Sequence, residues 1–201
     1  MKSVRKYFIL FFILLFIFSP FSCKKDLLKL VSVTLGTYTD TRDGRIYKTT
    51  TIGDYTWLAE NLDFKTDSGS CYYDYDSVAN KDYGRLYTWQ AAQAAVPPGW
   101  HLPTTTDVKY LYDSLGGYNE SAQICEVGNA HWESSHNNAN NYSGLTIIPG
   151  GGYDSTLVQF KGKGKGASFW EMGHWIWGIN SFLGYYNSSG AMLSVRCVKD
   201  Y

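Results

Sequence analysis

Few residue types in this 201-residue sequence have the spacing that chemistry requires. Its four histidines are His101, His131, His136 and His174. None belongs to a His-Glu-x-x-His pair, and no Cys-x-x-Cys pair is present, so the usual zinc-ligand patterns are missing. His101 lies in the segment Gly-Trp-His-Leu-Pro, and we expect its ring to be structural, hydrogen-bonded to a backbone group. The histidine spacing predicts no metal centre.

The acidic segment "YDYDSVANKD" is the candidate for a hard cation, which needs several oxygen ligands around one point. It contains Asp74, Asp76 and Asp82, but Val78 interrupts the spacing of a calcium-binding loop. We interpret the segment as a solvated acidic loop. No nucleophile beside a base and no glycine-rich phosphate loop is visible. The sequence therefore predicts a protein without catalytic residues and without a cofactor.

The N-terminus has the pattern of a secretory signal peptide over residues 1–22. Basic residues precede an almost unbroken apolar run that ends at "SPFSC". The run is short for a membrane span. Cys23 follows the expected cleavage site, and "PFSCKKD" resembles the cleavage box of bacterial lipoproteins. We therefore predict lipidation at Cys23 and a lipid-anchored outer-membrane protein, periplasmic or surface-exposed; the alternatives are an uncleaved anchor and an ordinary thiol.

Charge and cysteine content narrow the partners further. Without Lys2, Arg5 and Lys6 the chain has three more acidic than basic residues. Because phosphate binding needs a basic field, we expect no nucleic-acid partner. Outside the N-terminus the cysteines are Cys71, Cys125 and Cys197, so at most one disulfide forms within the chain, and its pairing stays open.

A binding surface is the remaining possibility, and the segment "FWEMGHWIWGINSFLGYYNSSG" favours it. Tyrosine and tryptophan offer rigid contact area, while asparagine and serine adapt their hydrogen bonds. The alternative is that the alternating tryptophans simply fill the core. The candidate ligand-binding residues are Trp175, Trp177, Asn180, Tyr185, Tyr186, Asn187 and Ser188.

Short strands and two helices must position these residues. Alternating residues and a Gly-Asp turn predict a hairpin over 43–62. Apolar residues at helical spacing predict helices over 83–96, ended by Pro97-Pro98, and over 106–115, capped by a threonine among 104–106. We expect a strand near 145–149, followed by a glycine turn, and three late strands in "ASFWEM", "HWIWGINSF" and "AMLSVRCVKDY". This order predicts an α+β fold.

Four segments carry a family resemblance: "DGRIYKTTTIGDYTWLAENL", "YGRLYTWQAA", "PPGWHLPTTTDVKYL" and "SVRCVKDY". In this order and spacing, over about residues 40–201, the chain resembles the Fibrobacter succinogenes major paralogous domain, a family of unknown role. The resemblance implies a C-type-lectin-like fold, a looped mixed sheet with two helices whose first and last strands lie close together. Family members often have cysteines where this chain has Val96 and Asn80-Lys81-Asp82, so Cys71 and Cys197 lack their usual partners.

These observations divide the chain into a signal peptide (1–22), a lipidated tether (23–36) and one lectin-like domain (37–201). Our main hypothesis is a non-catalytic binding module of the cell envelope whose partner is a glycan or a surface protein. An alternative is a structural subunit of a surface assembly, which predicts oligomers where the binding module predicts a monomer. A third is an enzyme related to formylglycine-generating enzymes, which share the fold but use a close pair of redox cysteines.

Overall fold

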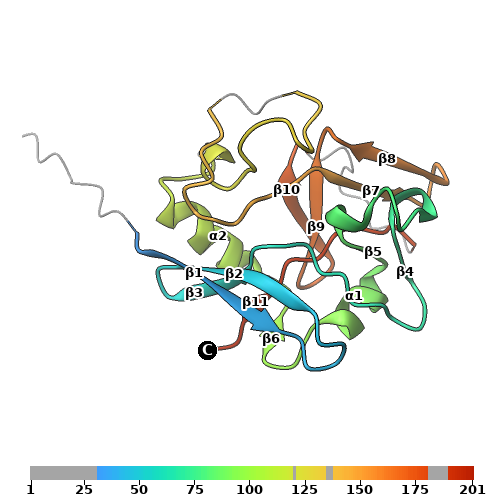
Figure 1. Ribbon diagram of the computed structural model, residues 1–201, viewed down its shortest axis with the longest axis horizontal. Coiled ribbons are helices and arrows are strands. Elements are labelled where there is room, and N and C mark those ends of the chain that lie inside the picture. Colours follow the sequence, from blue (N-terminus) through green and yellow to red (C-terminus); the bar gives the residue numbers. More distant parts are fainter. Residues whose placement is uncertain (1–30, 120, 135–137, 181–189) are drawn as a thin grey trace, which may run out of the picture.

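The computed structural model describes residues 31–119, 121–134, 138–180 and 190–201 (Figure 1). Within these residues no helix is both long enough and apolar enough to cross a membrane. The helices are α1 (Trp89–Ala95) and α2 (Thr105–Ser114), with short 3₁₀ turns η1 (Tyr73–Tyr75), η2 (Lys81–Tyr83) and η3 (Ser121–Gln123). The strands are β1 (Val33–Thr39), β2 (Ile46–Ile52), β3 (Tyr55–Leu58), β4 (Ser70–Cys71), β5 (Leu86–Tyr87), β6 (Trp100–His101), β7 (Gly150–Asp154), β8 (Gln159–Lys163), β9 (Ala167–Glu171), β10 (Trp175–Ile179) and β11 (Val198–Lys199).

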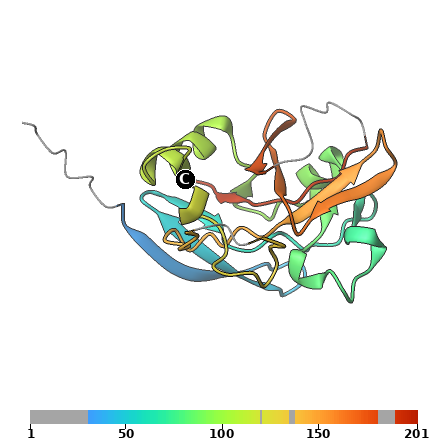
Figure 2. The ribbon, with the colours of Figure 1, turned by 90° about the horizontal axis from the view of Figure 1, so that it is seen from above.

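Two sheets form the body of the fold, which is α+β as the order of elements predicts. A five-stranded sheet has the order β1-β2-β3-β11-β6, and a four-stranded sheet has the order β10-β9-β7-β8. Figure 1 shows the first sheet at the lower left and the second at the upper right, and Figure 2 shows the same arrangement from above. β11 lies between β3 and β6, where Val198 is opposite both Trp57 and His101. The last strand, β11, thus belongs to the same sheet as the first strand, β1.

Local signals place the hairpin and the second helix correctly. β2 and β3 pair antiparallel around the Gly53-Asp54 turn. α2 begins after Thr104, whose side chain accepts a hydrogen bond from the Asp107 backbone N–H, while the Asp107 carboxylate accepts one from the Thr104 backbone. This reciprocal capping box satisfies two N–H groups that the first turn leaves free. The expected apolar face, which includes Val108 and Leu111, is buried.

Three expected boundaries are wrong, because long-range pairing overrides local propensity. The helix expected over 83–96 begins only at Trp89, because Leu86 and Tyr87 pair with β4 and Thr88 caps the helix. The expected strand near 145–149 begins instead at Gly150, and the glycines expected to form a turn pair with β8. The last expected strand is short, since only Val198–Lys199 form β11.

The first strand, β1, begins at Val33, although the expected tether extends to residue 36. Residues 33–36 belong to β1, which pairs antiparallel with β2 along its whole length. Most of its side chains are exposed, so the strand has little of the apolar alternation by which sequence reveals a strand. The pairing partner, not the local pattern, makes this segment a strand.

Candidate functional site

The expected aromatic site is only partly within the described residues. Trp177 is buried, with its ring 4.7 Å from Phe169 and 5.8 Å from Trp57 between ring centroids. Trp177 therefore lies in the hydrophobic core. Trp175, in β10, lies opposite Glu171 of β9. Asn180 is exposed and directly follows β10. Tyr185, Tyr186, Asn187, Ser188 and the lipidation residue Cys23 lie outside the described residues.

His101 has a structural environment, but its partners are carboxylates and not a backbone group. Its Nδ1 lies 2.8 Å from Asp200 Oδ1, and its Nε2 lies 3.2 Å from Asp107 Oδ2. Burial alone would raise the pKa of Asp107, but hydrogen bonds from Thr104, Tyr201 and His101 hold it below its ordinary value. His101 thus ties the start of α2 to the C-terminal segment.

The three cysteines of the body are all free thiols. Burial raises the pKa of Cys71 to about 11, that of Cys125 to about 12, and that of Cys197 further. The Cys71 sulfur lies 3.7 Å from the Met192 sulfur. A thiol with a raised pKa is a weak nucleophile at neutral pH, because the thiolate is the reactive form. Nothing in this geometry resembles a reactive cysteine pair.

A polar pocket of about 290 Å³ is the most chemically varied concavity we find among the described residues. It opens beside β2, where segments distant in sequence converge on one point. Its volume is at the low end of small-molecule sites, which usually measure about 300–1,000 Å³. The lining residues are Arg45, Lys48, Ala59, Glu60, Asn61, Asp82, Glu126, His131, Thr146, Ile148 and Arg196.

One wall of the polar pocket is a carboxylate–imidazole pair. His131 Nδ1 lies 2.7 Å from Glu126 Oε1, and the ring of His131 stands edge-on to that of Tyr83 at 5.1 Å. Glu126 Oε2 is buried and has no hydrogen-bond partner among the described residues. Burial, and secondarily the Glu126 carboxylate, raise the pKa of Tyr83. A buried carboxylate oxygen without a partner has unused capacity to accept a hydrogen bond.

The floor of the polar pocket is held by Arg196, the arginine of the "SVRC" segment. Its guanidinium is fully buried and donates to Asn61 Oδ1 at 2.7 Å, to the Leu145 carbonyl at 2.6 Å and to the Thr146 carbonyl at 3.0 Å. Thr146 has φ +53°, an unfavourable conformation for a β-branched residue. Strained residues of this kind persist only where the surroundings impose them, and they gather at functional sites.

Sequence reasoning missed this pocket for a specific reason. Glu126 and His131 are five residues apart in a loop, and this spacing matches neither a helix nor a strand period. The histidine spacing therefore gives no signal for His131. Asn61 and Arg196 are far apart in the chain and meet only through the five-stranded sheet. No local pattern could have indicated the convergence; the "SVRC" segment was the one available signal.

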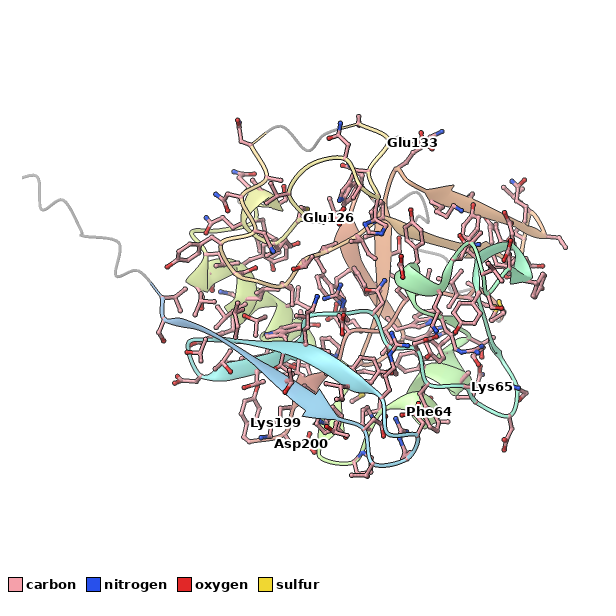
Figure 3. All side chains as sticks on the ribbon, in the orientation of Figure 1. Phe64, Lys65, Glu126, Glu133, Lys199 and Asp200 are labelled. Carbon is pink, nitrogen blue, oxygen red and sulfur yellow. The ribbon has the colours of Figure 1, made fainter. Side chains whose placement is uncertain are left out.

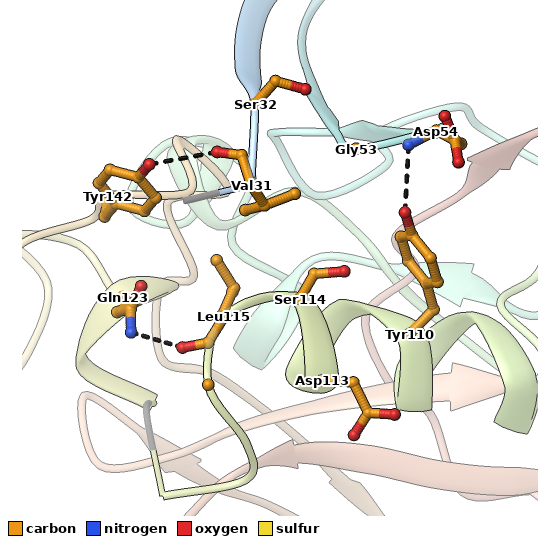
Figure 4. Close-up of a pocket in the computed structure, with 11 residues that line it drawn as sticks. Val31, Ser32, Gly53, Asp54, Tyr110, Asp113, Ser114, Leu115, Gln123 and Tyr142 are labelled. Carbon is orange, nitrogen blue, oxygen red and sulfur yellow. Dashed lines mark hydrogen bonds between the residues drawn. The ribbon is translucent and has the colours of Figure 1, made fainter. Parts of the chain in front are cut away.

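A second pocket, of about 550 Å³, lies where the described chain begins (Figure 4). Among the described residues, none of its buried side-chain polar atoms lacks a hydrogen-bond partner, whereas Glu126 Oε2 and Arg45 Nε of the polar pocket do. The Tyr142 hydroxyl donates to the Val31 carbonyl at 3.2 Å, and the Gln123 amide donates to the Leu115 carbonyl at 2.7 Å. This pocket therefore offers a ligand fewer unsatisfied polar groups than the polar pocket does.

The polar pocket and the His101 cluster occupy different parts of the molecule. Figure 3 shows Glu126 in the upper half of the view and Asp200 at the lower edge. His101 and its partners therefore support the fold around α2 and do not belong to the polar pocket.

Within the described residues, fold and site together define an α+β domain with the helices α1 and α2, a five-stranded sheet packed against a four-stranded one, and a polar pocket beside the N-terminal hairpin. Comparison with protein families adds the identity: residues 50–199 match the model of the Fibrobacter succinogenes major domain. The match covers most of the chain, so the chain belongs to that family, which confirms the resemblance of its four segments. No curated protein matches the chain. No solved structure matches it either.

Proposed function

We propose that this chain is a lipid-anchored cell-envelope protein whose lectin-like domain binds a glycan in the polar pocket without catalysis. One observation carries the proposal: Glu126, whose buried Oε2 has no hydrogen-bond partner among the described residues, lines a pocket rich in polar side chains. A hydroxyl-bearing ligand would donate to this oxygen and remove the cost of leaving it unsatisfied.

The balance of charge in the polar pocket favours a neutral, polar ligand. The acidic side chains Glu60, Asp82 and Glu126 are matched by Arg45, Lys48 and Arg196. A phosphate or nucleotide would meet as many carboxylates as cations there. Sugar hydroxyls both donate and accept hydrogen bonds, so they suit a pocket that offers acceptors and donors side by side.

The fold and the N-terminus support the remaining parts of the proposal. A C-type-lectin-like fold has two helices and a sheet that contains both the first and the last strand. The described residues of this chain have α1 and α2, and β1 and β11 belong to one sheet. The signal-like residues 1–22 and Cys23 support export and a lipid anchor, and an anchor would hold the domain where envelope glycans are available.

A glycan-array screen of the full-length chain in mild detergent tests the proposed ligand. We expect binding to a defined set of glycans, and a Glu126→Ala variant should bind them at least about 10-fold more weakly, which corresponds to about 1.4 kcal/mol. Asp113→Ala is the matched control, because it removes a carboxylate from the second pocket. Thermal melting of each variant separates a local effect from unfolding. If no glycan binds, or if a folded Glu126→Ala variant binds as wild type does, the proposal is wrong.

A further inference from the structure

The strand β1 forms an unusually unprotected sheet edge. It is the outermost strand of the five-stranded sheet, and its seven residues, "VTLGTYT", include no charged residue and no proline. Leu35, in its middle, is 70% exposed. Proteins normally protect a long edge strand with charges, proline or a bulge, because its free backbone groups can pair with another chain. Figure 2 shows β1, in blue, along the lower border of the molecule.

The hydrogen-bond register shows which backbone groups are free. The Gly53 N–H donates to the Ser32 carbonyl at 2.9 Å, so these two residues form a hydrogen-bonded pair at the end of the β1–β2 ladder. Such pairs alternate along antiparallel strands, and even-numbered residues of β1 therefore bond to β2. The N–H and C=O groups of the odd-numbered residues point away from β2, and no described residue bonds to them. These residues are Val33, Leu35, Thr37 and Thr39.

Two other outer strands lack this feature. β6, at the opposite border of the same sheet, has only two residues. β8, at one border of the four-stranded sheet, carries Lys161 and Lys163, which pair with Asp154 and Asn80. Short length and lysine side chains are the usual protections of an edge. β10, the other border of the four-stranded sheet, is also uncharged, but it has five residues where β1 has seven.

We propose that β1 pairs antiparallel with β1 of a second copy of this chain, in the register centred on Gly36. This register pairs all seven residues, places Leu35 opposite Thr37 of the second copy, and sets no like charges against each other. Gly36 would meet its own copy at a closely spaced, non-hydrogen-bonded position, where strands lie about 4.5 Å apart. The absence of a side chain there allows the close approach.

The pairing gives a two-fold dimer in which the same strand of each copy forms the contact. It joins the five-stranded sheets of the two copies into one continuous sheet and satisfies the outward backbone groups of β1. Tyr38 does not obstruct it, because its ring packs against Trp100 at 4.9 Å between centroids. The proposal does not use the polar pocket or its ligand, and it replaces the monomer that the sequence predicts for a binding module with a dimer of binding modules.

Sedimentation of the full-length chain in mild detergent, corrected for bound detergent, tests the dimer. We expect a particle of twice the chain mass at micromolar concentration, and a Leu35→Lys/Thr37→Lys variant should be a monomer, because the new charges face each other across the contact. Val78→Lys is the control: it charges an aliphatic residue that is even more exposed than Leu35 and lies away from β1, and this variant should remain dimeric. A monomeric wild type, or a folded double variant that remains dimeric, overturns the proposal.

Cysteine crosslinking tests the register. Two differently tagged chains, one with Leu35→Cys and one with Thr37→Cys, should form a disulfide-linked heterodimer on mild oxidation when mixed. Either variant alone should crosslink no more than wild type, whose Cys125 and Cys197 are buried. Efficient crosslinking of one variant alone, or none in the mixture, contradicts the register centred on Gly36.

Discussion

Replacing Arg196 with methionine should destabilise the domain strongly, because four buried acceptors depend on its guanidinium. Besides Asn61, Leu145 and Thr146, it donates to the Leu58 carbonyl at 3.3 Å. Burial lowers the pKa of Arg196 to about 9, against the opposing effect of the Glu60 carboxylate, so the guanidinium is still charged at neutral pH. Methionine keeps the length and apolar stem of the side chain but removes every donor.

The expected magnitude follows from the acceptors that lose their partners. A buried acceptor left unsatisfied costs about 1–3 kcal/mol. If two of the four find no new partner, the loss is about 2–6 kcal/mol, and we take about 3 kcal/mol as the expected value. For a domain of this size that lowers the melting temperature by about 6–12 °C. Arg196→Lys should be nearly as unstable, because a single ammonium cannot reproduce the planar fork that contacts several acceptors.

Urea denaturation measures this effect directly. The transition midpoint of Arg196→Met should fall while the slope stays the same, the sign of a change in stability alone. Lys109→Met, at an exposed ion pair on α2, is the control and should leave the midpoint in place. A loss below about 1 kcal/mol for Arg196→Met would refute the reasoning, since the acceptors would then have other partners.

Two further predictions concern the anchor and the acid stability. Cys23→Ser should move the chain from the detergent phase to the soluble phase of a phase-partition assay, because firm attachment requires lipid chains; a variant that stays membrane-bound would indicate an uncleaved N-terminal anchor. Asp107 has a pKa lowered below its ordinary 3.8, so its stabilising contribution is complete above that value and is lost as the pH falls through the lower folded-state pKa. The difference in urea midpoint between wild type and Asp107→Asn should therefore shrink below about pH 4, and a difference that stays constant would contradict this assignment.

Sequence alone determined the parts of this protein that depend on neighbouring residues. The capping box at Thr104 and Asp107, the turn at Gly53 and the apolar face of α2 are local hydrogen-bond and spacing patterns, so they could be read directly. The four family segments fixed the family and, with it, the α+β class. The signal peptide over residues 1–22 stays a prediction from composition and order, because these residues lie outside the described part of the chain.

Only the tertiary structure decided which residues meet. His101 pairs with Asp200, 99 residues later, and Arg196 bonds to Asn61, 135 residues earlier. The same holds for Trp177, which the packing of two sheets buries in the core, and for β1, which is a strand because β2 lies beside it. Contacts between distant segments leave no periodic trace in sequence, since each partner's local pattern is the same whether or not the other is near.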